Sequence, residues 1–421
     1  MQSKRIVIRN IGKLLQVSNG NLEFRRGEAM NQLPFITDAF LTIVDGKIHA
    51  FGPNHEAPLD GYEMMDANQG YVMPGLIDAH THLVFAEWRN REFEDRIRGL
   101  SYQEIAARGG GILNSAAKLN QLSEDELFDR SFIRLKQAMA RGTLALEIKS
   151  GYGLSTESEL KILRVIHRLK SVVPIPIKST FLGAHSFPMK YRENHDGYLR
   201  EIIEEMLPRI ASEQLADFCD VFCEKGFYSP EETDRILTAA AQYGLKARVH
   251  TNQFTHSGGL EIALKHGSIS VDHLEVLNDD EIQLLKKGTT HPVLLPFAAF
   301  FMNLEYPPAR KMIDSGLGVV LASDFNPGTS PNADLAWVWG LACNQMKMTP
   351  IEALNALTIN PAINLGIDGQ TGTIAIGNDA HLLLTKPIPD LSFIPYQYGN
   401  SWLSKIFVRG NPDFLDSDNL N

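Results

Sequence analysis

The feature of this 421-residue chain that most constrains its fold is a repeated alternation of apolar strand-like segments and amphipathic helical segments. The eight candidate strands are Tyr71–His80, Thr143–Lys149, Ile175–His185, Phe218–Glu224, Lys246–His250, Ser268–His273, Thr290–Leu295 and Gly318–Asp324. Helical patterns fill most of the intervals, at Glu124–Ala140, Glu157–Leu169, Asp196–Ala211, Pro230–Tyr243, Gly259–His266 and Thr349–Leu357. Strands and helices that alternate in this way predict a TIM-like (β/α)₈ barrel of the α/β class.

Both ends of the chain show short strand patterns instead. They lie at Ile6–Ile8, Phe40–Val44, Lys47–Phe51, Thr373–Ile376, His381–Thr385 and Lys405–Val408. Asp45-Gly46 is a hairpin signal between two of them. We expect a small composite β-sandwich domain from residues 1–70 and 366–421, beside a barrel domain of residues 71–365. The tail from Asn411, rich in Asp and Asn, is expected to be loose.

Composition narrows the possible functions. The formal charge of −10 argues against a general nucleic-acid binder, which needs a basic face. Three cysteines make no disulfide framework and fit a reducing compartment. Cys219 and Cys223 are expected to be buried core thiols, with a pair of thiolate ligands as the alternative. No signal-peptide pattern or membrane-length apolar run is present, so a cytoplasmic protein without membrane or nucleic-acid partners is expected.

Several residues able to carry chemistry follow the candidate strands directly, where the active sites of such barrels lie. They are His80, His82, His185, His250, His273 and Asp324. His80 and His82 are two residues apart at the end of an apolar segment, and side chains at that spacing in an extended chain point the same way. Three imidazoles and one carboxylate are typical of a catalytic metal site, and nitrogen-rich ligation suits zinc or iron.

Longer stretches around these residues resemble the amidohydrolase superfamily and, within it, the imidazolonepropionase family. They are HTHLVFAEWRNREFE from His80, RGGGI at Arg108–Ile112, EIKSGYGL at Glu147–Leu154, TFLGAH at Thr180–His185, VDHLE from Val271, and SDFNPGTSP at Ser323–Pro331. The resemblance covers essentially the whole chain. It implies metal-dependent hydrolysis of 4-imidazolone-5-propanoate to N-formimidoyl-L-glutamate in histidine degradation, and a homodimer.

The resemblance also implies roles for individual residues. One zinc or iron ion would be held by His80, His82, His250 and Asp324. Asp324 would take a proton from the attacking water and pass it to the leaving ring nitrogen, while His273 orients the water or steadies the oxyanion. His185 would donate to the substrate carbonyl. The substrate contacts would be Arg89, Tyr152, His185, Gln253, Asn326, Gly328 and Thr329, with Arg89 binding the propionate carboxylate.

Three alternatives remain open. A deaminase of a small nitrogen heterocycle is one, although Gln253 stands where such enzymes place a proton-shuttling glutamate. A second metal ion, supported by Glu224, is another, although Lys149 lies on the second strand and not the fourth. The third is an inactive barrel that serves as a scaffold, which the complete set of candidate ligands argues against.

Overall fold

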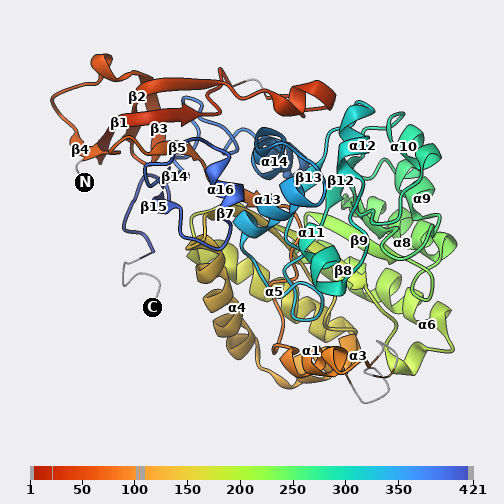
Figure 1. The fold of residues 1–421 in the computed structure, drawn as a ribbon. Helices are drawn as coiled ribbons and strands as arrows, with labels where there is room; N and C mark the ends of the chain where they lie inside the picture. Colours follow the sequence, from red (N-terminus) through yellow and green to blue (C-terminus); the bar gives the residue numbers. More distant parts are fainter. Residues whose placement is uncertain (1–3, 21, 101–103, 105–109, 416–421) are drawn as a thin grey trace.

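The structure is a computed structural model that describes residues 4–20, 22–100, 104 and 110–415. Figure 1 shows two parts, a barrel surrounded by helices and a separate sheet against one side of it. The separate sheet combines strands from both ends of the chain. The expected fold class is therefore confirmed. Of the stretches singled out above, Arg108 and Gly109 of the glycine run and the tail beyond residue 415 lie outside the described residues.

The barrel consists of eight parallel strands in the order β13-β12-β11-β10-β9-β8-β7-β6. They are β6 Leu76–Asp78, β7 Thr143–Lys149, β8 Ile177–Ala184, β9 Phe218–Cys223, β10 Lys246–Thr251, β11 Ser270–His273, β12 His291–Leu294 and β13 Val320–Leu321. Each overlaps one of the strands that the sequence predicts. Almost all of their residues are buried, because helices cover the outside and side chains fill the inside.

The barrel closes just beyond the ends of its first and last strands. The backbone N–H of Asp324 donates to His80 O at 3.0 Å, and that of His82 donates to Phe325 O at 2.8 Å. At the end of β6, the buried Asp78 carboxylate accepts the backbone N–H of Ser323, the residue before Asp324, at 3.0 Å. Closure therefore brings the HxH pair next to Asp324.

One predicted strand, Tyr71–His80, is wrong as a single element. The structure divides it into β5, Tyr71–Pro74, which joins the separate sheet, and β6, Leu76–Asp78, which begins the barrel. The division falls at Gly75, where a Cβ atom would lie 2.5 Å from Cβ of Leu144. Only glycine permits this close approach to the neighbouring strand, so the chain can turn from one sheet into the other there.

All six predicted helices are present, and one of them is interrupted. Asp196–Ala211 is α6 His195–Arg200, a π-helical turn η4 Glu201–Met206, and α7 Leu207–Ser212, because Pro208 supplies no N–H for a regular ladder. The others are α4 Glu124–Met139, α5 Thr156–Val172, α8 Pro230–Gln242, α9 Gly259–Lys265 and α14 Pro350–Leu357. The pattern missed α1 Asn90–Ile97, α3 Gly111–Gln121, α10 Asp279–Leu285, α11 Pro296–Met302, α12 Ala309–Asp314, α13 Leu335–Asn344, α15 Ile359–Leu365 and α16 Phe393–Tyr396.

The second sheet is mixed and has the order β15-β14-β5-β1-β2-β3, with β4 also paired to β1. Its remaining strands are β1 Arg5–Leu15, β2 Phe35–Val44, β3 Lys47–Pro53, β4 Glu63–Asp66, β14 Leu382–Thr385 and β15 Leu403–Phe407. The expected hairpin turn is present, with φ of 49° at Asp45 and 81° at Gly46. Of Thr373–Ile376, only an isolated bridge from Ile374 to Val17 forms. The domain boundaries at residues 70 and 365 stay a prediction.

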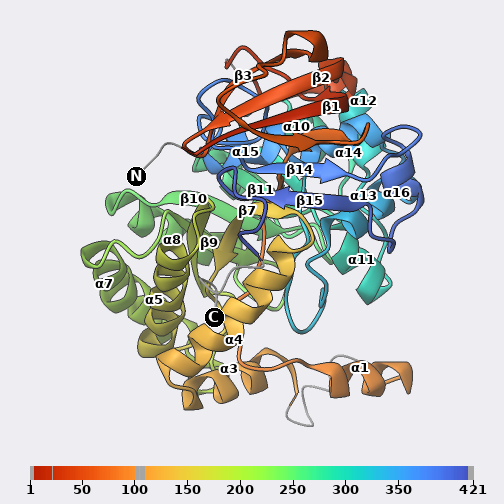
Figure 2. The same cartoon turned by 90° about the vertical axis from the view of Figure 1, so that its left-hand side faces the viewer.

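Figure 2 shows this sheet on the side of the barrel away from α1 and α3. None of the helices in the described part of the chain is long and apolar enough to cross a membrane.

Candidate metal centre and active-site cavity

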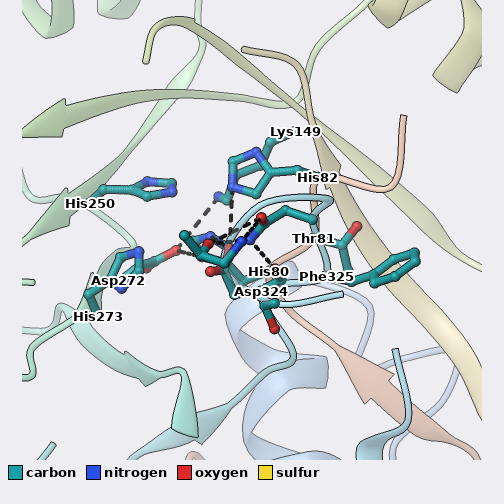
Figure 3. A network of polar contacts seen from close by, with 12 residues as sticks. His80, Thr81, His82, Lys149, His250, Asp272, His273, Asp324 and Phe325 are labelled. Atoms are coloured by element: carbon teal, nitrogen blue, oxygen red, sulfur yellow. Dashed lines mark hydrogen bonds and ion pairs between the residues drawn. The ribbon is translucent and has the colours of Figure 1, made fainter. Parts of the chain in front are cut away.

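The barrel strands bring three of the predicted ligands together at one end of the barrel. His80 and His82 follow β6, and Asp324 follows β13. The Nε2 atoms of His80 and His82 lie 3.4 and 3.5 Å from Asp324 Oδ1 (Figure 3). All three side chains are buried. Asp324 adopts a left-handed φ of 53°, which non-glycine residues rarely do outside special sites.

His250 and His273 complete the cluster from β10 and β11. One ring nitrogen from each of His80, His250 and His273 lies within 4.8 Å of the others, so these three form a second possible ligand group. His273 has a φ of 90° at the end of its strand. Nδ1 of His273 lies 3.3 Å from Glu275 Oε1, which gives this ring a carboxylate partner outside the cluster.

Two buried aspartates hold two of the candidate ligands from behind. Nδ1 of His80 lies 2.7 Å from Asp272 Oδ2, and Nδ1 of His250 lies 2.9 Å from Asp220 Oδ2. A carboxylate at Nδ1 leaves Nε2 as the nitrogen available to a metal ion. Nε2 of both rings is buried and has no hydrogen-bond partner among the described residues.

The electrostatics of the cluster suit a metal ion. Burial lowers the pKa of His80, His82 and His250, so that all three rings are neutral, as metal ligands must be. Burial also raises the pKa of Asp324 to about 7. These buried donors, three neutral imidazoles and one carboxylate, fit a zinc or iron ion.

A buried lysine lies next to the two aspartates that hold the cluster. The Lys149 ammonium, at the end of β7, lies 2.8 Å from Glu147 Oε1, 2.8 Å from Asp220 Oδ2 and 3.6 Å from Asp272 Oδ2 (Figure 3). None of these four side chains has measurable exposure. Burial alone would lower the pKa of Lys149, but the three carboxylates together raise it. Lys149 is therefore an ammonium ion.

A cavity of about 310 Å³ opens above the cluster. Its lining contains every predicted site residue except His80, which lies deeper, and Gly328. The lining residues are His82, Arg89, Ile112, Tyr152, His185, Phe222, Phe227, His250, Gln253, Phe254, His273, Met302, Asp324, Asn326 and Thr329. Five of these residues are apolar and the other ten carry polar groups, so the cavity can bind a small molecule that has both apolar and polar parts.

Arg89 reaches this cavity with its guanidinium already held in place. Its Nε donates to Glu92 Oε2 at 2.8 Å, and the other oxygen of Glu92 accepts the backbone N–H of Gly111 at 3.0 Å. Gly328 touches the far side of the guanidinium: a Cβ atom there would lie 2.3 Å from Arg89 Nη1. The arginine is thus fixed between helices α1 and α3 and the loop after β13.

Tyr152 lies in a loop held by a buried carboxylate. Glu159 accepts the backbone N–H groups of Gly151, Gly153 and Leu154 at distances of 2.7 to 2.9 Å. His185 joins the same loop, with its Nδ1 3.2 Å from Gly151 O. Burial lowers the pKa of His185 to about 3, so its ring is neutral.

The loop after Asp324 satisfies its own polar groups. Oδ1 of Asn326 accepts the backbone N–H of Gly328 and of Thr329, both at 2.8 Å. The N–H of Gly328, one of the predicted substrate contacts, therefore already has a partner. The Asn326 side-chain amide donates to Asp324 O at 2.7 Å, which links this turn to the metal cluster.

Two other candidates for metal ligation lie elsewhere. Glu224 accepts the backbone N–H groups of Lys225 and Phe254, at 2.9 and 3.0 Å, and belongs to none of the possible ligand groups in the described residues. A second metal ion bound through Glu224 is therefore disfavoured. Cys219 and Cys223 are buried free thiols, as expected.

The sequence analysis did not single out the residues that support the site: Glu92, Glu147, Glu159, Asp220, Arg248, Asp272 and Glu275. A signal for some of them was present. Asp220 lies within Phe218–Cys223, and Glu147 within Thr143–Lys149, and a charged residue inside a fully buried strand needs a partner.

Comparison with known proteins identifies the family of this chain. The model of the amidohydrolase family matches residues 71–413. Imidazolonepropionase from Flavobacterium johnsoniae is 48% identical over 405 residues, covering 96% of this chain and 98% of the relative. Imidazolonepropionase from Thermoanaerobacter pseudethanolicus is 40% identical and covers 89% of each chain.

Solved structures share the fold at low identity. Guanine deaminase from E. coli superposes with a TM-score of 0.71 at 15% identity, covering 97% of this chain and 98% of that one. A zinc-bound adenosine deaminase from Xanthomonas campestris has a TM-score of 0.70 at 15% identity, with 97% and 92% covered. These structures share the fold, while the family match and the full-length relatives show that the chain belongs to the amidohydrolase family and, within it, to the imidazolonepropionases.

Proposed function

We propose that this chain hydrolyses the ring amide of 4-imidazolone-5-propanoate to N-formimidoyl-L-glutamate, a step of histidine degradation. The observation that carries the proposal is the position of the Arg89 guanidinium and the histidine–aspartate cluster in the walls of one cavity. A substrate with a carboxylate at one end and a cyclic amide at the other needs both. The names of the full-length relatives support the same substrate.

We propose His80, His82, His250 and Asp324 as the ligands of one zinc or iron ion. When bound, this ion acts as a Lewis acid and lowers the pKa of a coordinated water. The Asp324 carboxylate takes the proton of the attacking water and delivers it to the leaving ring nitrogen. Burial, which raises the pKa of Asp324 to about 7 in the absence of the ion, makes this carboxylate more basic than an exposed one.

The remaining polar groups position the substrate. Arg89 binds its carboxylate with charge-assisted hydrogen bonds. Tyr152, Gln253, Asn326 and Thr329 contact it from the cavity walls, and Gly328 contributes by letting Arg89 approach. His185 donates a hydrogen bond to the substrate carbonyl oxygen in this proposal. Because the Gly151 carbonyl oxygen accepts the Nδ1 proton of the neutral ring, this donation requires the His185 proton on Nε2 when the substrate is bound.

His273 has a different role in this proposal. Burial opposes a charge on its ring, but the Glu275 carboxylate raises its pKa above the usual value. A protonated His273 close to Asp324 steadies the negative charge that develops on the carbonyl oxygen. A cytoplasmic location, expected from the cysteine content and the sequence pattern, and a homodimer, implied by the family resemblance, are part of the proposal.

Ultraviolet monitoring of imidazolonepropionate tests the activity directly. The purified chain should consume it, stop when a chelator removes the metal, and resume when zinc or iron is restored. Ammonia is measured in parallel, because a deaminase releases it in amounts equal to turnover and this hydrolysis does not. Ammonia release with guanine or adenosine, and no loss of imidazolonepropionate, would refute the proposal.

A further inference from the structure

The most unusual group outside the proposed chemistry is the buried Lys149 ammonium beside the proposed metal centre. A lysine is rarely buried without compensation, because transfer of an ammonium out of water is costly. Here three carboxylates compensate it, from Glu147 on its own strand, Asp220 on β9 and Asp272 on β11. Each of these strands belongs to the same barrel.

Two of the three carboxylates also hold candidate ligands. Oδ2 of Asp220 contacts both Lys149 and Nδ1 of His250. Oδ2 of Asp272 contacts both Lys149 and Nδ1 of His80. The ammonium therefore contacts the aspartates that hold two of the predicted ligands. Its position fixes both carboxylates and, through them, both imidazole rings.

The same carboxylates form a possible cation site of their own. Ligand atoms of Asp220, His250 and Asp272 all lie within 4.8 Å of one another, as those of a metal site do. Lys149 contacts both aspartates of this group. A second metal ion bound to them would stand close to the ammonium, and the repulsion between the two charges in a buried site would be severe.

We infer that the Lys149 ammonium takes the place of a second metal ion: it balances Glu147, Asp220 and Asp272, holds the aspartates that orient His80 and His250, and keeps the centre mononuclear. The inference rests on the proposed metal centre. Lys149 is thus a positioning residue, which touches neither the substrate nor the reacting atoms. The buried Arg248 adds a second positive charge near Asp272, with Nη2 3.8 Å from Asp272 Oδ2.

The test is the number of zinc ions that metal-stripped protein binds, measured by equilibrium dialysis and elemental analysis. The wild-type chain should bind one. Lys149→Ala should bind two, because it opens space beside Asp220, Asp272 and Glu147 and removes the repelling charge. Lys170→Ala is the matched control, since Lys170 also pairs with an aspartate, Asp217, 3.1 Å away, but outside the barrel. It should still bind one.

The outcomes separate the inference from the proposal on which it rests. One zinc in Lys149→Ala, or two in the wild type, would overturn the role of Lys149 and leave the metal centre standing. No zinc in the wild type would refute the metal centre itself. If Lys149→Ala does not fold, the double variant Lys149→Ala, Glu147→Gln removes one buried charge of each sign and keeps both aspartates. Two ions in the double variant support the inference and one overturns it.

Discussion

Arg89 and Gly328 are packed so closely that a methyl group on Gly328 would lie 2.3 Å from Arg89 Nη1. The backbone of the loop after β13 thus forms one wall of the guanidinium site. Because the guanidinium is also held by Glu92, it cannot retreat without breaking an ion pair. The structure therefore supports a steric role for Gly328, whose N–H already donates to Asn326 Oδ1.

Gly328→Ala should move Arg89 and weaken substrate binding. Crowding of this kind costs about 1–3 kcal/mol, so kcat/KM should fall about 10-fold or more, mainly through KM, with metal content unchanged. Gly369→Ala is the control, because a Cβ there meets nothing within 4 Å. Equal kinetics of the two variants would show that Arg89 does not need this contact.

Substitution of Arg89 itself should lower kcat/KM more than Gly328→Ala does. Arg89→Ala removes the proposed carboxylate partner, so kcat/KM should fall by roughly 10²-fold while the metal is retained. Arg89→Lys keeps the charge but not the planar fork, and should recover only part of the loss. The assignment fails if Arg89→Ala has wild-type kinetics.

Glu159→Gln should loosen the loop that carries Tyr152. The amide nitrogen cannot accept, so at least one of three buried backbone N–H groups loses its partner, at a cost of about 1–3 kcal/mol. KM should rise and the melting temperature should fall, whereas Glu126→Gln, at an exposed helix cap, should leave KM unchanged.

A double-mutant cycle distinguishes positioning of Tyr152 from a general loss of stability. If Glu159 acts through Tyr152, Glu159→Gln should raise KM much less in a Tyr152→Phe background. An undiminished effect there would show that Glu159 supports the fold but not this contact.

His381 should make the stability of the fold sensitive to acid. Burial lowers its pKa from 6.5 to about 4. Between these pH values the unfolded chain binds a proton at His381 and the folded chain does not. The free energy of unfolding is therefore undiminished by this group above pH 6.5 and decreases as the pH falls towards 4.

The slope due to one such group is at most about 1.4 kcal/mol per pH unit. Urea unfolding of metal-free protein at several pH values should therefore show a shallower decline for His381→Gln than for wild type. His49→Gln, at an exposed position, should follow the wild type. Parallel curves for wild type and His381→Gln would contradict the assignment.

The barrel and its catalytic end could be predicted because both depend on local patterns. Most barrel strands are rich in apolar residues, and His80, His82 and Asp324 directly follow such stretches. The ends of parallel strands meet at one face, so position along the chain was enough to place these residues together. The break at Gly75 was missed because it arises from contact with Leu144, which the local pattern does not contain.

The supporting residues could not be predicted in the same way. Lys149, Asp220 and Asp272 come from three different strands, and their contacts depend on which strands are neighbours and in what register. The pairing of Asp272 with His80 joins residues 192 positions apart. Glu159 was assigned to a helix correctly, but its three backbone partners depend on how the preceding loop folds back.

The most direct test of the account is the metal content of His250→Ala and His273→Ala, measured beside wild type. The control is His266→Ala, outside the cluster, whose ring pairs with Asp234. With His80, His82, His250 and Asp324 as the ligands, His250→Ala should lose both metal and turnover. His273→Ala should keep the metal and lose much of kcat. Full metal in His250→Ala would contradict this ligand set and favour a centre that does not need His250. A metal-free His273→Ala would also contradict it and favour the group formed by His80, His250 and His273.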